Sequence, residues 1–192
     1  MSLILKISPR FDSTKLTDAQ FDDRVDVYED RVRGWLINCG HILNEHEHAG
    51  FGVLQVGLAY FEGFAVFWRG EDSDRKSEEF FKDGLVRVFP EVEGWPPQVK
   101  SDFASAMFRD GRCGLFHLGV ARSRVVLSDG EPVFRLEAVD AQSNPIIRVH
   151  IDRKLFIQRI DEHLSSFVAL LRDPQQTERH RNFEAAWTLV HS

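Results

Sequence analysis

The chain has 192 residues, of which 43% are hydrophobic and 28% are charged, so it can bury a core without disulfide bonds or a structural metal. A net charge of −6 at pH 7 argues against a protein that coats nucleic acid with a large basic surface, because phosphate neutralisation drives such binding. Two cysteines exclude a disulfide scaffold, and the apolar run at residues 1–7 is too short for a signal peptide. We therefore expect a cytoplasmic protein with a single domain over residues 1–192.

The first helix is predicted over residues 18–44. Thr17 and Gln20 have the spacing of a capping box, in which a hydroxyl caps the helix and a side chain three residues later reaches back. Apolar residues then recur in steps of three and four, with one adjacent pair, at Phe21, Val25, Tyr28, Val32, Trp35, Leu36, Cys39 and Leu43. This spacing predicts an amphipathic helix.

The second helix is predicted over residues 49–68, which are apolar nearly all round. The segment has about the length of a membrane span. It carries Gln55 and Glu62, however, and the rest of the chain is typical of a soluble protein, so we expect a central buried helix and no membrane partner. Glycines at positions 50, 52, 57 and 63 lower its helix propensity but let neighbouring helices approach closely.

Two shorter helices are predicted next. Ser73 or Asp74 is placed to cap a third helix, which Pro90 ends. A fourth helix begins near Gln98 and leads into a stretch with glycines at positions 111, 114 and 119. That stretch holds the motif from which the functional prediction comes.

The hydrophobic period then changes from 3.6 to 2 residues. Residues 124–127 and 132–139 flank Ser128-Asp129-Gly130-Glu131, which is a good hairpin signal, and residues 146–151 are a third candidate strand. We predict a small antiparallel insert, either a β-hairpin or three strands, at about residues 123–151.

Two helices complete the predicted fold. Asp152 is placed to cap a long helix that Pro174 ends, and a last helix covers roughly residues 176–190. The sequence therefore predicts a mainly α fold, a helical bundle with a small β insert.

One motif points to a specific chemistry. Arg112 and His117 are separated by four residues in Arg112-Cys113-Gly114-Leu115-Phe116-His117. Histidine exchanges a proton near neutral pH, and arginine holds a phosphate through its planar fork. Residues five apart on an ideal helix point about 140° away from each other, so both side chains reach one ligand only where the helix is distorted or ends. Gly114 and Gly119 permit such a break.

The stretch from Met107 to His117 resembles the Arg-x(4–6)-His motif of the HEPN superfamily, the higher eukaryotes and prokaryotes nucleotide-binding domains. The resemblance implies a bundle of four or five core helices that forms a homodimer. Many members are metal-independent ribonucleases of toxin–antitoxin, abortive-infection and CRISPR systems, in which the Arg and His of two protomers face each other across a composite cleft. Active members usually carry a polar residue, often Asn, directly after the Arg, whereas this chain has Cys113. The cysteine at this position bears on nuclease activity and leaves the expected fold unchanged.

The resemblance implies catalytic roles for Arg112 and His117 without any cofactor. His117 would help an RNA 2′-hydroxyl attack the adjacent phosphate, and Arg112 would stabilise the negative charge that develops there. The implied partners are a second copy of the chain, RNA or a nucleotide, and an antitoxin or other protein.

Further residues are expected to support this site. Arg109, Arg122 and Arg124 lie close in sequence and are expected to supply a local positive field for nucleic acid. Glu62, alone among the apolar residues of the central helix, is expected to orient Arg112 or His117.

Two alternatives remain open at this point. Arg112 and His117 can instead satisfy carbonyl groups at a helix C-terminus, with Glu62 as a structural acid, in a non-catalytic dimeric interaction module. A weaker alternative is a metal site in the segment His41 to His48, because His41 and Glu45 have the i, i+4 spacing of helical metal ligands. The favoured prediction includes no metal.

Overall fold

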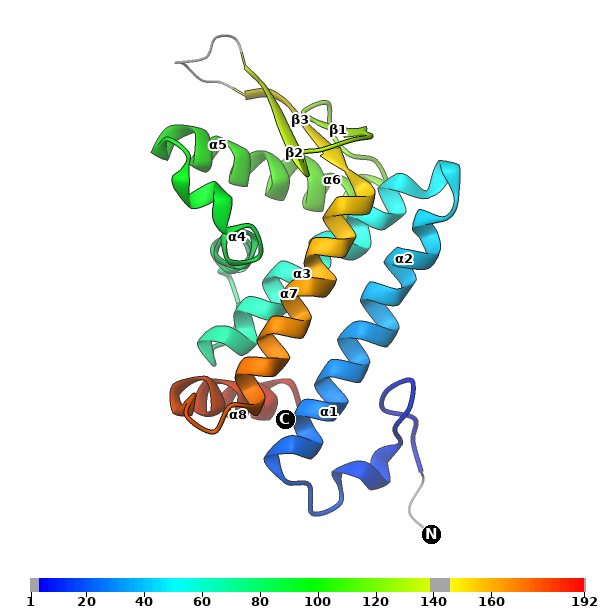
Figure 1. The fold of residues 1–192 in the computed structure, drawn as a ribbon, viewed down its shortest axis with the longest axis vertical. Helices are drawn as coiled ribbons and strands as arrows, with labels where there is room; N and C mark the ends of the chain where they lie inside the picture. Colours follow the sequence, from blue (N-terminus) through cyan, green and yellow to red (C-terminus); the bar gives the residue numbers. More distant parts are fainter. Residues whose placement is uncertain (1–3, 139–145, 192) are drawn as a thin grey trace.

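The computed structural model describes residues 4–138 and 146–191. The fold is mainly helical with a small three-stranded insert, as predicted. The α-helices are α1 (Phe21–Arg31), α2 (Asn38–Asn44), α3 (Gly50–Arg69), α4 (Ser77–Val88), α5 (Pro97–Ala106), α6 (Cys113–Leu118), α7 (Arg153–Arg172) and α8 (Thr177–His191). The strands are β1 (Val125–Ser128), β2 (Phe134–Ala138) and β3 (Ile146–Asp152). In Figure 1 the rod of α1 and α2 runs beside α3 and α7, with the sheet at one end and α8 across the other.

The first predicted helix is a continuous rod made of α1, a π-helical stretch over Val32–Ile37, and α2. Its end at Asn44 was predicted, but its start was wrong. Asp18 has a left-handed backbone with φ of 55°, which stops a helix from beginning at Thr17. Gln20 is the N-cap instead, and it forms the capping box with Asp23.

The central helix α3 is buried as predicted, and phenylalanines surround it. The side chains of Phe61, Phe81, Phe89 and Phe156 are fully buried and contact one another edge to face or in stacked pairs. Together with the turn before it, α3 is long and apolar enough to cross a membrane, but half of its most apolar window is buried inside the protein. The packing of α2, α4, α7 and α8 around α3 makes it the core helix of a globular protein.

Glycines set the closest helix contacts. A Cβ atom at Gly84 in α4 would lie 2.1 Å from the backbone oxygen of Phe61 in α3, and one at Gly57 would lie 2.5 Å from the Phe156 ring. Gly63 differs, since outside its own helix backbone no described atom lies within 4 Å of the place where its Cβ would be. The prediction that glycines permit close approach is therefore confirmed at position 57 and wrong at position 63.

The sheet has the strand order β1-β3-β2, so the predicted hairpin between the first two strands is wrong. β3 lies in the centre, parallel to β1 and antiparallel to β2, so the sheet is mixed and the predicted antiparallel arrangement is wrong for β1. Val149 and Ile151 of β3 are fully buried, and a strand with that much buried apolar surface occupies the centre rather than an edge. The turn that resembled a hairpin instead carries the chain past the end of β3, where the Gly130 amide donates to the Asp152 carboxylate (2.6 Å).

Asp152 also caps α7, as predicted. One carboxylate oxygen accepts from the backbone amides of Lys154 and Leu155, both at 2.9 Å. The helix ends at Arg172, before Pro174. The Asp152 side chain therefore joins the end of the sheet to the start of α7.

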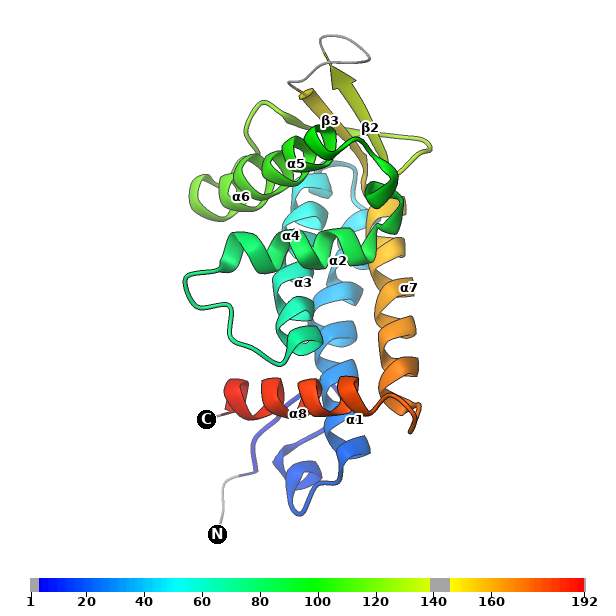
Figure 2. The same cartoon turned by 90° about the vertical axis from the view of Figure 1, so that its left-hand side faces the viewer.

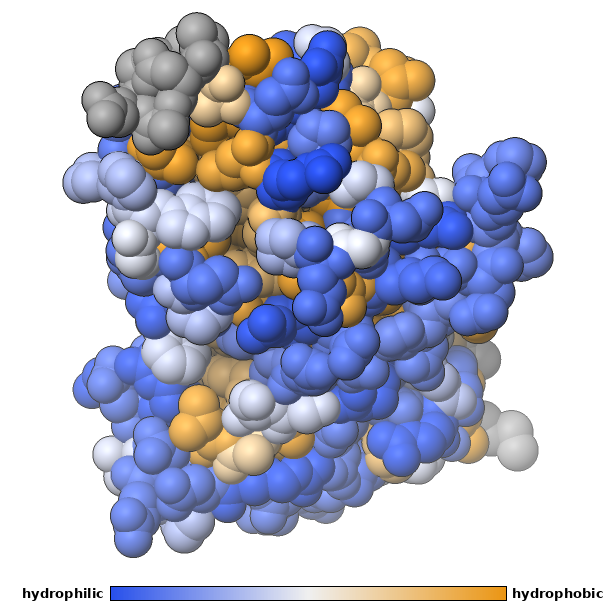
Figure 3. All heavy atoms as spheres, turned by 45° about the horizontal axis from the view of Figure 1, so that its top comes forward, coloured by the Kyte–Doolittle hydropathy of each residue, from blue (hydrophilic) through white to orange (hydrophobic). Residues whose placement is uncertain are grey.

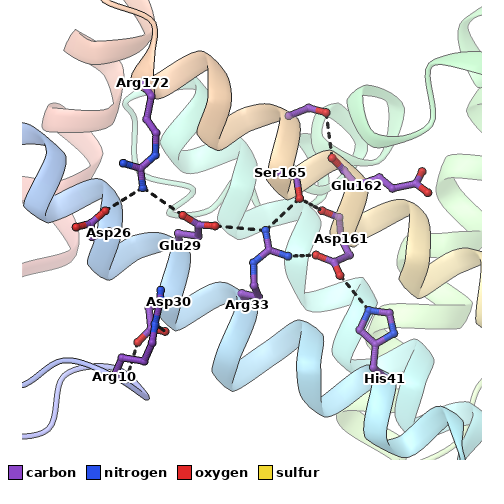
Figure 4. A network of polar contacts seen from close by, with 11 residues as sticks. Arg10, Asp26, Glu29, Asp30, Arg33, His41, Asp161, Glu162, Ser165 and Arg172 are labelled. Atoms are coloured by element: carbon purple, nitrogen blue, oxygen red, sulfur yellow. Dashed lines mark hydrogen bonds and ion pairs between the residues drawn. The ribbon is translucent and has the colours of Figure 1, made fainter.

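Ion pairs fasten α7 to the first helical rod, as Figure 4 shows. Arg172 of α7 donates to Asp26 (2.9 Å) and Glu29 (3.3 Å) of α1. Asp161 of α7 accepts from Arg33 and from His41, whose Nε2 lies 3.2 Å away. These contacts hold α7 antiparallel to the first helical rod along most of its length.

Candidate functional site

Arg112 lies at the end of a π-helical stretch, Met107–Arg112, that joins α5 and α6 into one rod across the end of the molecule (Figure 2). The Arg112 side chain is 28% exposed. Its Nη2 donates to the Glu62 carboxylate at 3.1 Å. The expected contact between the lone acid of the central helix and Arg112 is therefore present.

Glu62 is held by two more donors. Its Oε1 accepts from the hydroxyls of Ser73 (2.8 Å) and Ser77 (2.6 Å), while Oε2 takes the Arg112 bond. The Glu62 side chain is only 18% exposed, and a largely buried carboxylate needs hydrogen-bond donors in place of the water that it loses. Glu62 therefore fixes one edge of the Arg112 guanidinium, and no hydrogen bond to the residues that the structure describes uses its other N–H groups.

A cleft of about 670 Å³ opens beside this pair. Its walls are mostly apolar, and its polar groups are few. The apolar walls come from Leu36, Leu43, Val56, Leu58, Val66 and Phe116, and the polar groups from Gln55, Glu62, Ser73 and Arg112. The volume and the small number of converging polar groups are typical of a binding site.

Two aromatic rings flank Arg112. Its guanidinium carbon lies 5.7 Å from the centre of the Phe108 ring and 5.5 Å from that of Phe116. Phe108 is buried, whereas Phe116 is 67% exposed. Arg112 is thus positioned from three sides, by Glu62 and by two rings with which a cation interacts favourably.

His117 lies elsewhere on the same short helix. It is exposed near the end of α6, where Gly119 has a left-handed φ of 71°, and its ring contacts that of Phe116. It does not line the Arg112 cleft, and none of the described contacts joins it to Arg112. The predicted break occurs at Gly119, where α6 ends, and not at Gly114, while a π-helical distortion precedes Arg112. Neither feature places His117 in the Arg112 cleft of the same chain.

The predicted supporting arginines differ from one another. The Arg109 side chain is 63% exposed and lies 3.5 Å from Glu78. Arg122 is exposed. Arg124 forms ion pairs with Asp110 and with Asp102 (3.1 Å). It therefore links the rod of α5 and α6 to β1, and its charge is already paired. Cys113 is half buried and packs against the core.

The metal alternative lacks its ligands. His41 turns toward Asp161 of α7, away from a shared site with Glu45. Over residues 4–138 and 146–191, no group of three or more His, Cys, Asp or Glu side chains is placed to hold a metal ion.

Exposed apolar residues surround His117. Phe116, Leu118 and Val120 are each at least 59% exposed, and we call these three residues the α6 tip. A run of exposed apolar side chains costs solubility unless a partner covers it. On the face in Figure 3, hydrophobic residues gather toward the end that carries the sheet, and hydrophilic residues cover most of the rest.

The two serines that hold Glu62 were missed as part of the site. Ser73 was considered only as a helix cap, and Ser77 was not singled out. Both lie more than ten positions from Glu62, and no periodic pattern joins them to it. Comparison with family models, with curated proteins and with solved structures found no match to this chain.

Proposed function

We propose that this protein is a HEPN-type, cytoplasmic RNA-binding homodimer that cleaves RNA without a metal, as part of a defence or toxin–antitoxin system. The observation that carries the proposal is the placement of Arg112. It is held by Glu62 and two aromatic rings at the edge of a cleft, and among the described residues its other N–H groups have no hydrogen-bond partner. Such a preorganised cation suits a phosphate that gains charge during reaction.

A second copy of the chain would complete the site. His117 lies outside the Arg112 cleft of its own chain, and the apolar α6 tip surrounds it. If the α6 tips of two chains pack together about a two-fold axis, each His117 moves toward the Arg112 of its partner. The same contact removes the exposed apolar residues from water.

The chemistry needs only groups that the chain and the RNA supply. His117 accepts the proton of a 2′-hydroxyl as its oxygen attacks the adjacent phosphorus. Arg112 stabilises the added negative charge on the phosphate oxygens. The bond from phosphorus to the 5′-oxygen breaks, and that oxygen takes up a proton. The products are a 2′,3′-cyclic phosphate and a 5′-hydroxyl, with no net change in redox state.

Local positive charge supports RNA binding despite the acidic chain. Arg109 and Arg122 are exposed in the segments on either side of α6. Two or three such charges give weak, salt-sensitive contacts with phosphates rather than a broad binding surface. The RNA would therefore be held mainly at the cleft.

The second candidate is a non-catalytic dimeric interaction module. It is favoured by the Glu62 carboxylate, which offsets the Arg112 charge, and by Cys113 in place of the usual Asn. In that case the ion pair of Arg112 with Glu62 is only structural, and the α6 tip binds a protein partner.

Cleavage of a labelled mixed-sequence RNA in EDTA tests the proposal. Wild type should produce cyclic-phosphate ends, and Arg112→Ala and His117→Ala should each lose cleavage while staying folded. His48→Ala removes an exposed histidine that lies outside the motif and does not line the cleft, and it should cleave like wild type. Absence of cleavage by wild type, with a stable dimer, favours the interaction module.

Mixing the two inactive variants tests the composite site. If Arg112 and His117 act across the dimer, a heterodimer of the two variants contains one intact site. Free exchange of chains should then restore about a quarter of wild-type activity, because half of the dimers are mixed and each has one of two sites. A mixture that stays inactive would show that the two residues act within one chain.

A further inference from the structure

A second cavity, of about 470 Å³, lies between α3, α4 and α7 and shares no lining residue with the Arg112 cleft. We call it the His163 cavity. Its flat apolar walls include Trp68 and Phe167, and its polar groups include Arg87, His163 and Ser166. It belongs to none of the chemistry proposed above, so any ligand it binds is independent of the RNA site.

His163 presents one defined N–H group. Its Nδ1 lies 2.9 Å from the hydroxyl of Tyr60, which is 2% exposed. That hydroxyl has no other hydrogen-bond partner among the described residues, so it must donate to Nδ1 or remain an unsatisfied buried donor. A neutral imidazole that accepts at Nδ1 carries its proton on Nε2. Burial lowers the pKa of His163 to about 4, with a smaller contribution from Arg87, so the ring is neutral at pH 7.

Arg87 supplies a second set of donors. Its guanidinium lies 4.6 Å from the centre of the Trp68 ring, and its Nε donates to Asp83 at 2.9 Å. No hydrogen bond described in the structure uses its Nη groups. Arg179 also lies 4.1 Å from the centre of the Trp68 ring and donates to the Trp68 carbonyl, so two cations contact this ring.

The acidic groups at this cavity are already paired. Asp83 accepts from Arg69 (2.8 Å) as well as Arg87, and Glu93 accepts from Lys100 (2.7 Å). The cavity therefore offers donors and flat apolar surface, with its carboxylates engaged elsewhere. We propose that the His163 cavity binds a small aromatic carboxylate, whose ring lies against Phe167 and Leu170 and whose oxygens accept from Arg87 and His163.

Titration calorimetry of the full chain with indole-3-acetate tests the proposal. The acid should bind, and the neutral indole-3-acetamide should bind at least about tenfold more weakly, because charge-assisted hydrogen bonds are lost. Arg87→Gln should weaken binding of the acid by a similar factor. Arg148→Gln, a control on β3, and Arg112→Ala, in the other cleft, should bind the acid like wild type.

Three results would overturn the proposal: no binding of the acid at millimolar concentration, equal binding of acid and amide, or loss of binding in Arg112→Ala. Because His163 substitutions leave the Tyr60 hydroxyl without a partner, its role is best followed in the wild-type protein. Nitrogen-15 NMR should show a proton on Nε2 of His163 whose resonance shifts when the acid is added. An unmoved resonance would place the ligand elsewhere.

Discussion

The Tyr60 hydroxyl and Nδ1 of His163 form a hydrogen bond between a core helix and α7, 2.9 Å long. Burial raises the pKa of Tyr60 well above its usual value of 10 and lowers that of His163 to about 4. The pair is therefore neutral through the whole physiological range. Between pH 4 and 7 the contribution of this pair to stability changes only through His163, because the pKa of Tyr60 lies far above that range.

The first prediction is a loss of stability in mild acid. The folded pKa of His163 lies below its unfolded value of about 6.5, so the unfolded chain binds more protons between those two values. Stability is fully present above pH 6.5 and declines as pH falls toward 4, by at most about 3 kcal/mol from this residue. Urea unfolding of wild type and His163→Gln at several pH values measures the difference. Identical pH slopes for the two proteins would contradict the assignment.

The second prediction concerns the carboxylate that holds Arg112. Glu62→Ala leaves a guanidinium and two serine hydroxyls without their partner and should cost about 1–3 kcal/mol of unfolding free energy. Glu71→Ala, at an exposed acid just after α3, should change stability by less than about 0.5 kcal/mol. Denaturant unfolding of both variants makes the comparison. Equal stability would mean that Glu62 is no anchor for Arg112.

The third prediction compares two helix glycines. Gly84→Ala places a Cβ atom 2.1 Å from the Phe61 backbone oxygen and should destabilise the protein by at least about 2 kcal/mol. Gly63→Ala meets open space and should stabilise the chain by about 0.5–1 kcal/mol, the usual difference in helix propensity. Thermal unfolding gives both values.

Gly63 also lines the Arg112 cleft. If a partner chain packs against the cleft, Gly63→Ala should weaken the dimer while it stabilises the monomer. Sedimentation over a range of concentrations separates these effects, and unchanged dimerisation would place the partner away from Gly63.

The fourth prediction concerns Asp152, which serves the sheet and α7 together. Asp152→Ala removes a helix cap and the acceptor for the Gly130 amide, and should cost about 2 kcal/mol. Asp152→Asn keeps an oxygen that can cap the helix, so its cost should be less than half as large. Chemical denaturation of the two variants tests the assignment, which fails if alanine and asparagine have the same effect.

The sequence predicted the helices well because their signals are local. Steps of three and four, prolines at helix ends and the Asp152 cap all act within a few residues. The start of α1 was misplaced because Thr17 and Gln20 have the right spacing, and only the left-handed backbone at Asp18 rules it out. Strand order was misjudged for a related reason: the turn around Gly130 favours a hairpin locally, but the burial of Val149 and Ile151 decides the centre of the sheet.

Residues of the candidate site were predicted from the sequence only where their side-chain type contrasts with that of their neighbours. Glu62 is an acid within an apolar helix, and that contrast indicated a partner. Ser73 and Ser77 are ordinary residues in a polar segment, and their contact with Glu62 arises from how α4 packs on α3. The glycine pattern correctly indicated a helix end at Gly119, but it did not predict the π-helical stretch before Arg112 or the separation of His117 from the cleft.

The central place of β3 has a consequence for the order of synthesis. β3 accepts β1 as its parallel neighbour, and the Ile146 amide donates to Asp102 (2.7 Å) in α5. Asp102 in turn binds Arg124. The contacts that support the Arg112 motif are thus completed only by β3, which is synthesised some thirty residues after the motif. A fragment that ends before residue 146 contains both Arg112 and His117 but lacks the strand that holds their support in place, so such fragments are poor substitutes for the full chain.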